Sequence, residues 1–173
     1  MKKTRKLALM GLYISMALAL YIFEKTLPVP FIAPGAKLGL ANIITLTALI
    51  TLGFKDAFVI LMVRILMGSI FGGGVSAFLY SITGGVLSIL FMQLTRIVGR
   101  KNVSLIGISV VGAVFHNIGQ LLAAALIINN VNIFVYLPIL FLTAIGTGIF
   151  VGLVSRYLVS FINKHVPYFS INN

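Results

Sequence analysis

The chain is poor in charged residues, and this deficit limits what kind of protein it is. Charged side chains make up 9% of its 173 residues, whereas 60% of them are hydrophobic, and the mean hydropathy is +1.16. A soluble domain carries about a quarter of its residues as charged side chains. A chain this apolar cannot cover its own surface with polar groups in water, but lipid solvates apolar side chains. The composition therefore excludes a soluble enzyme and predicts an integral membrane protein.

Cysteine is absent and acidic residues are nearly so. Without a thiol the chain forms neither disulfides nor thiolate metal sites. Glu24 and Asp56 are its two acids, against 13 Lys and Arg residues, and the net charge is +11. Such a charge in a soluble protein would indicate nucleic-acid binding. Here, however, the basic residues form short clusters between apolar runs, as do the residues that set the orientation of membrane-spanning helices. We therefore expect contact with a lipid bilayer and no binding to nucleic acid.

Apolar runs separated by short polar or glycine-rich breaks predict the transmembrane helices. Since about 20 residues cross a bilayer, 173 residues hold five or six spans. The prolines between Glu24 and Lys37 exclude a regular helix there and predict an extended connection at the outer surface. The sequence thus predicts one all-α transmembrane domain over residues 1–173. Its helices are expected at approximately residues 7–23, 38–52, 57–71, 75–98, 104–128 and 134–161.

The distribution of basic residues predicts the orientation of this bundle. With six spans and a cytoplasmic N-terminus, the basic clusters fall in cytoplasmic segments, and Lys25 and Lys37 alone fall in outer loops. This is the excess that the positive-inside rule describes. Five spans would place Arg156 and Lys164 outside and spoil the pattern. We therefore predict a multi-pass bundle of six helices with both termini in the cytoplasm.

Arg64 is the residue that is hardest to place in a membrane. It lies about eight positions into the predicted helix 57–71, or roughly 12 Å from its start. A guanidinium at that depth costs at least about 2.5–3.5 kcal/mol unless it faces protein, water or a counter-ion. The two acids are predicted at the membrane surfaces, and Gly68 and Gly72 leave open space on the same helix face. We favour an arginine that binds an anionic ligand. The alternative is an arginine that donates hydrogen bonds to backbone carbonyls or extends its side chain to the inner membrane interface.

A second polar group lies near the middle of the predicted helix 104–128. His116 and Gln120 share one stripe with small residues at four-residue spacing, and Asn117 lies about 100° round from His116. Such side chains are costly in a membrane helix unless they face the bundle interior. Hydrogen bonding between helices explains any one of them alone, but the cluster favours the wall of a cavity. His116 has no second His, Cys or acid nearby, so we expect no metal site.

Lys37 and Asn42 stand at the entrance and in the first turn of the predicted helix 38–52. The N-terminus of this helix directs free N–H groups toward the outer side, where they favour an anion. Lys37 either contributes to anion binding or is a basic residue that reaches the interface. Asn42 lies deeper and is expected to be buried.

Small residues at four-residue spacing predict places where helices approach closely. Gly148 and Gly152 are expected to contact another helix of this chain. Gly11, Ser15 and Ala19 form a similar stripe on the first helix, where a partner subunit and an internal contact are equally compatible with the pattern.

Three segments of the sequence together suggest a known family, namely residues 38–43 (LGLANI), 63–69 (VRILMGS) and 112–120 (GAVFHNIGQ). They resemble the Gx transporter family, whose members are labelled heptaprenyl diphosphate synthase component I in Gram-positive bacteria. The resemblance runs over nearly the whole chain, and its last segment is the most specific. It implies a bacterial cell-membrane protein built like the substrate-binding S components of energy-coupling factor (ECF) transporters, with an outward-facing small-molecule pocket. S components dock on a transmembrane coupling subunit driven by two ATPases, and the small-residue stripe on the first helix is compatible with such docking.

The enzyme label itself does not fit the residues. Chain-elongating prenyl synthases need two aspartate-rich clusters to hold Mg²⁺, and this chain has two acids in all. We therefore expect no catalytic activity and no cofactor. The leading hypothesis is an S component that captures a small anionic vitamin-like molecule, or an isoprenoid or quinone precursor, for ATP-driven uptake. The alternative is a non-catalytic membrane accessory subunit of a prenyl diphosphate synthase. The substrate-binding residues expected under the leading hypothesis are Lys37, Asn42, Arg64, His116, Asn117 and Gln120.

Overall fold

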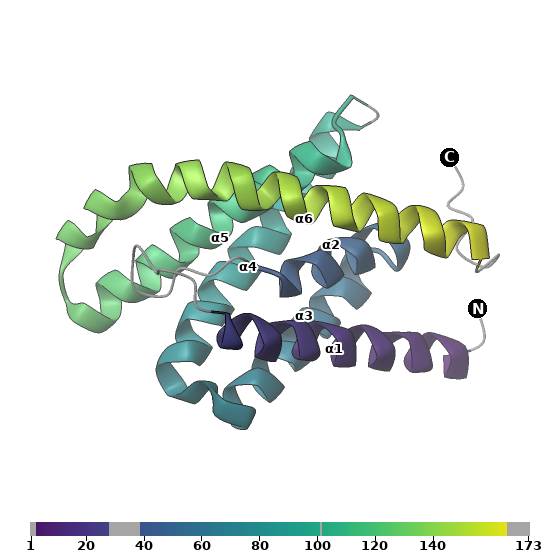
Figure 1. Ribbon diagram of the computed structural model, residues 1–173, viewed down its shortest axis with the longest axis horizontal. Helices are drawn as coiled ribbons and strands as arrows, with labels where there is room; N and C mark the ends of the chain where they lie inside the picture. Colours follow the sequence, from purple (N-terminus) through teal and green to yellow (C-terminus); the bar gives the residue numbers. More distant parts are fainter. Residues whose placement is uncertain (1–2, 28–38, 101, 166–173) are drawn as a thin grey trace.

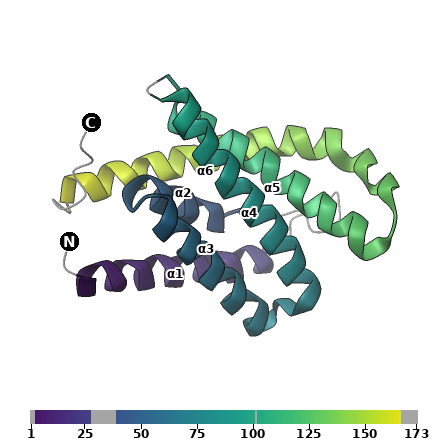
Figure 2. The same cartoon turned by 180° about the vertical axis from the view of Figure 1, so that it is seen from behind.

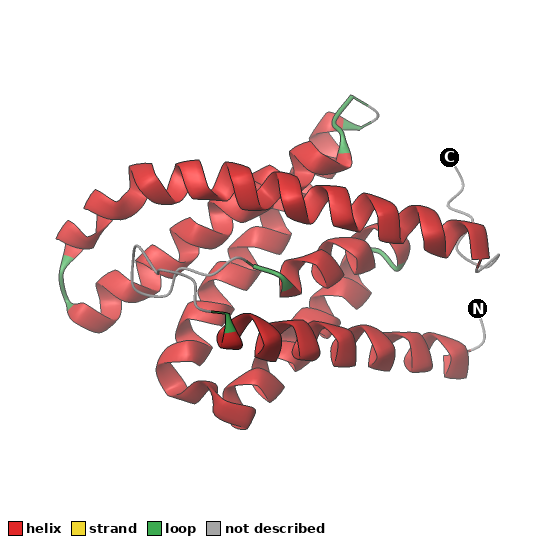
Figure 3. Ribbon diagram, viewed as in Figure 1, coloured by secondary structure: helices red, strands yellow, loops and turns green. Residues whose placement is uncertain are grey.

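The computed structural model describes residues 3–27, 39–100 and 102–165, and these ranges contain six α-helices and no strand (Figures 1 and 3). A π-helix, Ser69–Gly73, joins the third α-helix to the fourth, and a 3-10 helix, Val131–Tyr136, precedes the sixth. The α-helices are α1 (Lys3–Thr26), α2 (Ala41–Thr51), α3 (Phe54–Gly68), α4 (Gly74–Gly99), α5 (Leu105–Ile128) and α6 (Leu137–His165).

The α-helices follow the predicted apolar runs in order, but the end of α1 was predicted wrongly. The helix does not stop before Glu24; it continues through Lys25 to Thr26. The first proline after α1 is Pro28, and proline has no backbone N–H group to donate within a helix. The residues before it carry no such restriction. Glu24 therefore stands in the last turn of a helix. The predicted extended connection up to Lys37 lies mostly outside the described residues.

Successive helices run in alternating directions. Lys6 Nζ lies 2.8 Å from Asp56 Oδ1, which joins the start of α1 to the start of α3. Arg96 donates a hydrogen bond of 3.1 Å to the carbonyl of Leu49, which joins the end of α4 to the end of α2. The end of α6 lies at the same end of the molecule as the start of α1 in both Figure 1 and Figure 2. We call this side of the molecule, where most of the basic residues lie, the basic end.

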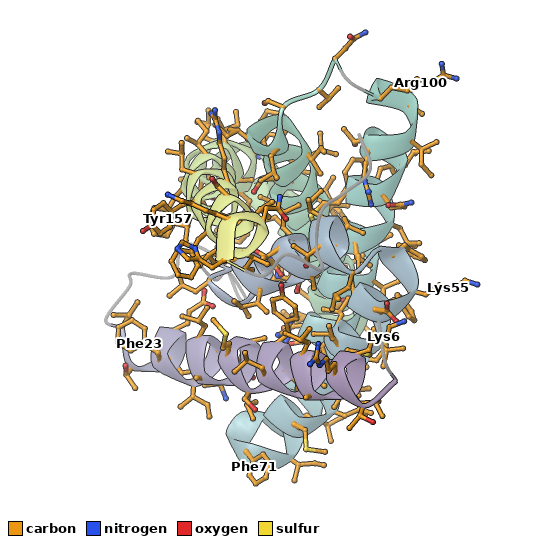
Figure 4. The ribbon with its side chains drawn as sticks, turned by 90° about the vertical axis from the view of Figure 1, so that its right-hand side faces the viewer. Lys6, Phe23, Lys55, Phe71, Arg100 and Tyr157 are labelled. Atoms are coloured by element: carbon orange, nitrogen blue, oxygen red, sulfur yellow. The ribbon has the colours of Figure 1, made fainter. Side chains whose placement is uncertain are left out.

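Four helical segments are long and apolar enough to cross a membrane, namely Thr4–Thr26, Gly74–Gly99, Leu105–Ile128 and Val131–His165. Large apolar side chains cover their outer faces, and Phe23, Phe71 and Tyr157 point away from the bundle (Figure 4). Such a surface would be unfavourable in water. These helices identify a multi-pass membrane protein. α2 and α3, with 11 and 15 residues, reach about 16 and 22 Å at 1.5 Å per residue, so the assignment of six spans and of cytoplasmic termini remains a prediction.

Glycines bring the long helices into close contact. A Cβ atom on Gly148 or Gly152 of α6 would lie 2.6 or 2.7 Å from a Cα atom of α5. This confirms the predicted internal contact of these two glycines. On the other side of α5, a Cβ on Gly119 would lie 2.6 Å from the carbonyl oxygen of Thr83 in α4. α4, α5 and α6 thus form a tightly packed layer.

α2 lies at the centre of the bundle. Its residues from Ala41 to Leu49 are all buried, and Ser155 of α6 donates a hydrogen bond of 3.1 Å to the carbonyl of Ile43. The hydroxyl of Thr47 donates to the same carbonyl at 2.7 Å, and that of Thr45 donates to the carbonyl of Ala41 at 3.3 Å, so these buried hydroxyl groups are satisfied within the protein. The first turn of this central helix contributes to two cavities.

Candidate ligand-binding site

A small cavity lies among five helices in the half of the bundle away from the basic end. We call it the arginine cavity. Its volume of about 10 Å³ leaves room for about one water molecule. The end of α1, the start of α2 and the end of α3 meet at it, and α4 and α5 complete its wall. The lining residues are Tyr21, Glu24, Gly39, Ala41, Asn42, Arg64, Ser81, His116 and Gln120.

Arg64 is buried beside this cavity, with 4% of its surface exposed. Its guanidinium carbon lies 5.9 Å from the centre of the Tyr21 ring, within the range of a cation–π interaction. Within the described structure no group accepts a hydrogen bond from its Nε atom. A buried donor without an acceptor costs free energy comparable to a lost hydrogen bond. The arginine therefore faces the protein interior, with hydrogen-bonding capacity to spare.

The open space predicted beside Gly68 is filled. A Cβ atom on Gly68 would lie 3.0 Å from the Tyr21 ring. The prediction of a void there was wrong. A glycine indicates that its own helix leaves room for a neighbour, but it does not indicate that the ring of Tyr21 from another helix fills that room. Tyr21 thus packs between α1 and α3 and reaches Arg64.

Glu24 is a site residue that the sequence analysis missed. Its carboxylate was expected at the outer surface, but 4% of the residue is exposed and it lines the arginine cavity. Oε1 accepts a hydrogen bond of 2.6 Å from the backbone N–H of Gly39, which fixes the entrance to α2. The carboxylate attracts Arg64 electrostatically, but no ion pair between these two residues occurs in the described structure.

A signal for Glu24 was present in the periodicity of α1. Tyr13, Ala17, Tyr21 and Glu24 follow each other at spacings of four, four and three residues, and all four are buried. Such spacing marks one face of a helix. Extending the predicted helix by one turn would have placed Glu24 on that buried face.

His116 and Gln120 face the arginine cavity, as their shared stripe predicted. Gln120 is 3% exposed, and neither its Nε2 nor its Oε1 atom has a hydrogen-bonding partner in the described part of the chain. Gly84 of α4 makes room for both, since a Cβ atom there would lie 3.1 Å from each of the two side chains. Asn42 is buried on the facing side, in the first turn of α2. The structure therefore brings Asn42, Arg64, His116 and Gln120 together.

Asn117 does not join them. Its Nδ2 atom donates a hydrogen bond of 2.9 Å to the carbonyl of Leu140, and its side chain faces α6. For this residue the structure supports a hydrogen bond between helices and not a place in the wall of the arginine cavity. The reason is the angle of about 100° between neighbouring residues of a helix, which turns Asn117 away from the stripe of His116.

Replacing Asn117 with Leu is expected to lower the free energy of unfolding by about 0.6–2 kcal/mol, because a hydrogen bond between α5 and α6 is lost. Unfolding of the purified protein in mixed detergent micelles measures the change. Thr143 Oγ1 also donates a hydrogen bond of 3.0 Å to the Leu140 carbonyl, and a stability equal to that of the wild type would show that this bond is sufficient and that the one from Asn117 contributes nothing.

Of the remaining predicted residues, the three that form the stripe on α1 do not line the arginine cavity. Lys37 lies outside the described residues. Gly11, Ser15 and Ala19 occupy an exposed face of α1, and a Cβ atom on Gly11 would meet no atom within 4 Å. The stripe is therefore not used for packing within the described structure, which leaves it available to lipid or to a partner.

An apolar exterior combined with buried charged and amide side chains defines a multi-pass helical membrane protein with an internal polar site. The family model described as heptaprenyl diphosphate synthase component I matches residues 13–158, and the chain belongs to this family. The match includes all residues that line the arginine cavity and confirms the family resemblance inferred from the sequence. No curated protein and no solved structure matches the chain.

Proposed function

We propose that this protein is the substrate-binding S component of an ECF-type transporter and captures a small anionic organic molecule from outside a bacterial cell. The observation that carries the proposal is the pairing of a buried arginine with a buried amide, both with unused hydrogen-bonding atoms. Arg64 Nε, Gln120 Nε2 and Gln120 Oε1 lack partners within the described residues. A carboxylate or phosphate supplies the acceptors that Arg64 Nε and Gln120 Nε2 lack.

Glu24 limits the charge that a ligand has to supply. Its carboxylate already offsets part of the positive potential of Arg64. Because Glu24 lines the same cavity, it repels the negative charge of a ligand that Arg64 attracts, and this repulsion increases with the number of negative charges on the ligand. This favours a monoanion, such as an aromatic carboxylate, among the vitamin-like, isoprenoid and quinone-precursor candidates.

The site has to widen before an organic molecule enters. Its volume of about 10 Å³ is that of a single water molecule, so an organic molecule fits only after the surrounding side chains have moved apart. Ligand binding would then select or induce a more open arrangement of the side chains around the cavity.

A catalytic role in prenyl chain elongation does not suit the positions of the two acids. Asp56 is paired with Lys6 at the basic end, whereas Glu24 lies 18 residues further along α1 from Lys6, or about 27 Å at 1.5 Å per residue. The two carboxylates cannot share a Mg²⁺ ion. We therefore propose that the chain is not an enzyme, and that its energy source is a pair of ATPase subunits acting through a coupling subunit.

The coupling subunit is proposed to dock on the stripe of Gly11, Ser15 and Ala19. A Gly11→Leu variant is expected to fold normally, because no atom lies near the new side chain, and to lose the coupling subunit and both ATPases on affinity purification. Gly146→Leu, at an equally open position on α6, serves as the matched control and should retain them. Recovery of the three subunits with both variants would place the docking surface elsewhere.

The family description supports a second candidate, a non-catalytic membrane subunit of a prenyl diphosphate synthase. The same purification separates the two functions. Recovery of a coupling subunit and two ATPases supports the transporter. Recovery of a soluble prenyl synthase, with no ATPase present, would overturn the transporter proposal in favour of the accessory subunit.

A further inference from the structure

A second cavity lies deeper in the bundle, among α2, α4, α5 and α6. We call it the serine cavity. Its volume is also about 10 Å³, which is space for about one water molecule. Asn42 lines both cavities, so one residue of α2 belongs to both walls. The residues around the serine cavity are Asn42, Ser88, Met92, Ser109, Gly112, Ala113, Thr147 and Val151.

The two serines of this cavity have unsatisfied hydroxyl groups. Ser88 and Ser109 are 2% and 3% exposed, and the Oγ atom of each lacks a hydrogen-bonding partner in the parts of the chain that the structure describes. A hydroxyl in a membrane helix usually bonds to a carbonyl of the preceding turn, as Thr47 does here with Ile43. The serines do not, so their hydroxyls are left for a group that enters the cavity.

The residue shared by the two cavities suggests that one elongated ligand could occupy both of them. Each cavity alone is too small for an organic molecule. A rearrangement of the Asn42 side chain would join them into one elongated site, with Arg64 and Gln120 at one end and the two serines at the other. Met92, which is flexible and lies against Gly112, gives the deep end room to adjust.

We infer that the ligand reaches past Asn42 and carries an uncharged hydroxyl or carbonyl group at the end opposite its anionic group. This inference rests on the proposed function, because it assigns the anionic group to Arg64. The two serine hydroxyls bind the polar end. An isoprenyl chain would leave both hydroxyls buried without partners, so a prenyl phosphate is disfavoured relative to a hydroxylated or keto-substituted aromatic carboxylate.

The test compares two carboxylates of equal length, 6-hydroxy-2-naphthoate and 6-methyl-2-naphthoate, with isopentenyl diphosphate as a third probe. Binding to the purified protein in lipid nanodiscs is measured by titration calorimetry. The wild type is expected to bind the hydroxy compound about tenfold more tightly than the methyl compound, which corresponds to one well-placed hydrogen bond. In the double variant Ser88→Ala, Ser109→Ala the preference should fall to less than about threefold. Removing unsatisfied hydroxyls should leave the melting temperature unchanged or raised.

The outcomes separate this inference from the proposed function. If Arg64→Gln weakens binding of both naphthoates but the serine variant keeps the wild-type preference, the serine cavity does not hold the far end of the ligand. A wild-type preference for the methyl compound or for isopentenyl diphosphate also overturns the inference. If no probe binds in an Arg64-dependent manner, the proposed function and this inference both fail.

Discussion

An Arg64→Gln variant is expected to bind small carboxylates at least about a hundredfold more weakly than the wild type. A hydrogen bond to a charged group contributes about 1.5–3 kcal/mol, and each 1.4 kcal/mol is about a factor of ten in affinity, so the loss of the bond from Nε together with the loss of the guanidinium charge gives this factor. Titration of 6-hydroxy-2-naphthoate in nanodiscs measures it. Because the charge of Arg64 also compensates the buried Glu24 carboxylate, the variant is expected to be less stable than the wild type, and its melting temperature is measured first to show that it is folded during the titration.

Arg156→Gln is the matched control for this experiment. Arg156 is exposed near the end of α6, at the basic end, and its replacement removes the same charge far from the arginine cavity. Its affinity should equal that of the wild type. Equal affinities of the two variants would mean that the buried arginine does not contact the anion and that only the net charge of the protein matters.

A Gly119→Val variant is expected to lose about 3 kcal/mol or more of its free energy of unfolding. A Cβ atom on Gly119 would lie 2.6 Å from the Thr83 carbonyl oxygen and 2.7 Å from Gly84 Cα. Both are backbone atoms that cannot rotate away, so α4 and α5 would have to separate. Overpacking of this kind costs about 1–3 kcal/mol for side chains that can adjust, and sometimes more.

Gly146→Val controls for the change in helix propensity, since a Cβ atom on Gly146 meets nothing within 4 Å. Unfolding in mixed micelles should show little change for this variant. The same shift of α5 should also weaken ligand binding in Gly119→Val, because His116 and Gln120 lie on that helix. A stability equal to that of Gly146→Val would contradict the tight contact between α4 and α5.

The sequence contained most of the helical architecture. Apolar runs as long as a bilayer is thick can only form helices in lipid, because every backbone N–H and C=O must be satisfied internally. For the same reason the stripe of His116 and Gln120 could be expected to face inward. The alternating connectivity and the assembly of Arg64 with Asn42 near that stripe then follow from short connections between neighbouring helices.

Partners that come from other helices could not be predicted. Periodicity places Asn117 about 100° from His116, but only the fold shows that the Leu140 carbonyl lies opposite. In the same way Gly68 predicted room but not the ring of Tyr21. Glu24 was missed because one further turn of α1 decides whether its carboxylate faces the bundle or the surface.

Mass spectrometry of the protein gently purified from its own membrane tests the central claim most directly. If Arg64 and Gln120 hold a small anion, wild type and Arg156→Gln should release one small acidic molecule, and Arg64→Gln should release none of it. Release of the same molecules in equal amounts from all three proteins, or of no acidic molecule from the wild type, would contradict a role in capturing an anionic solute.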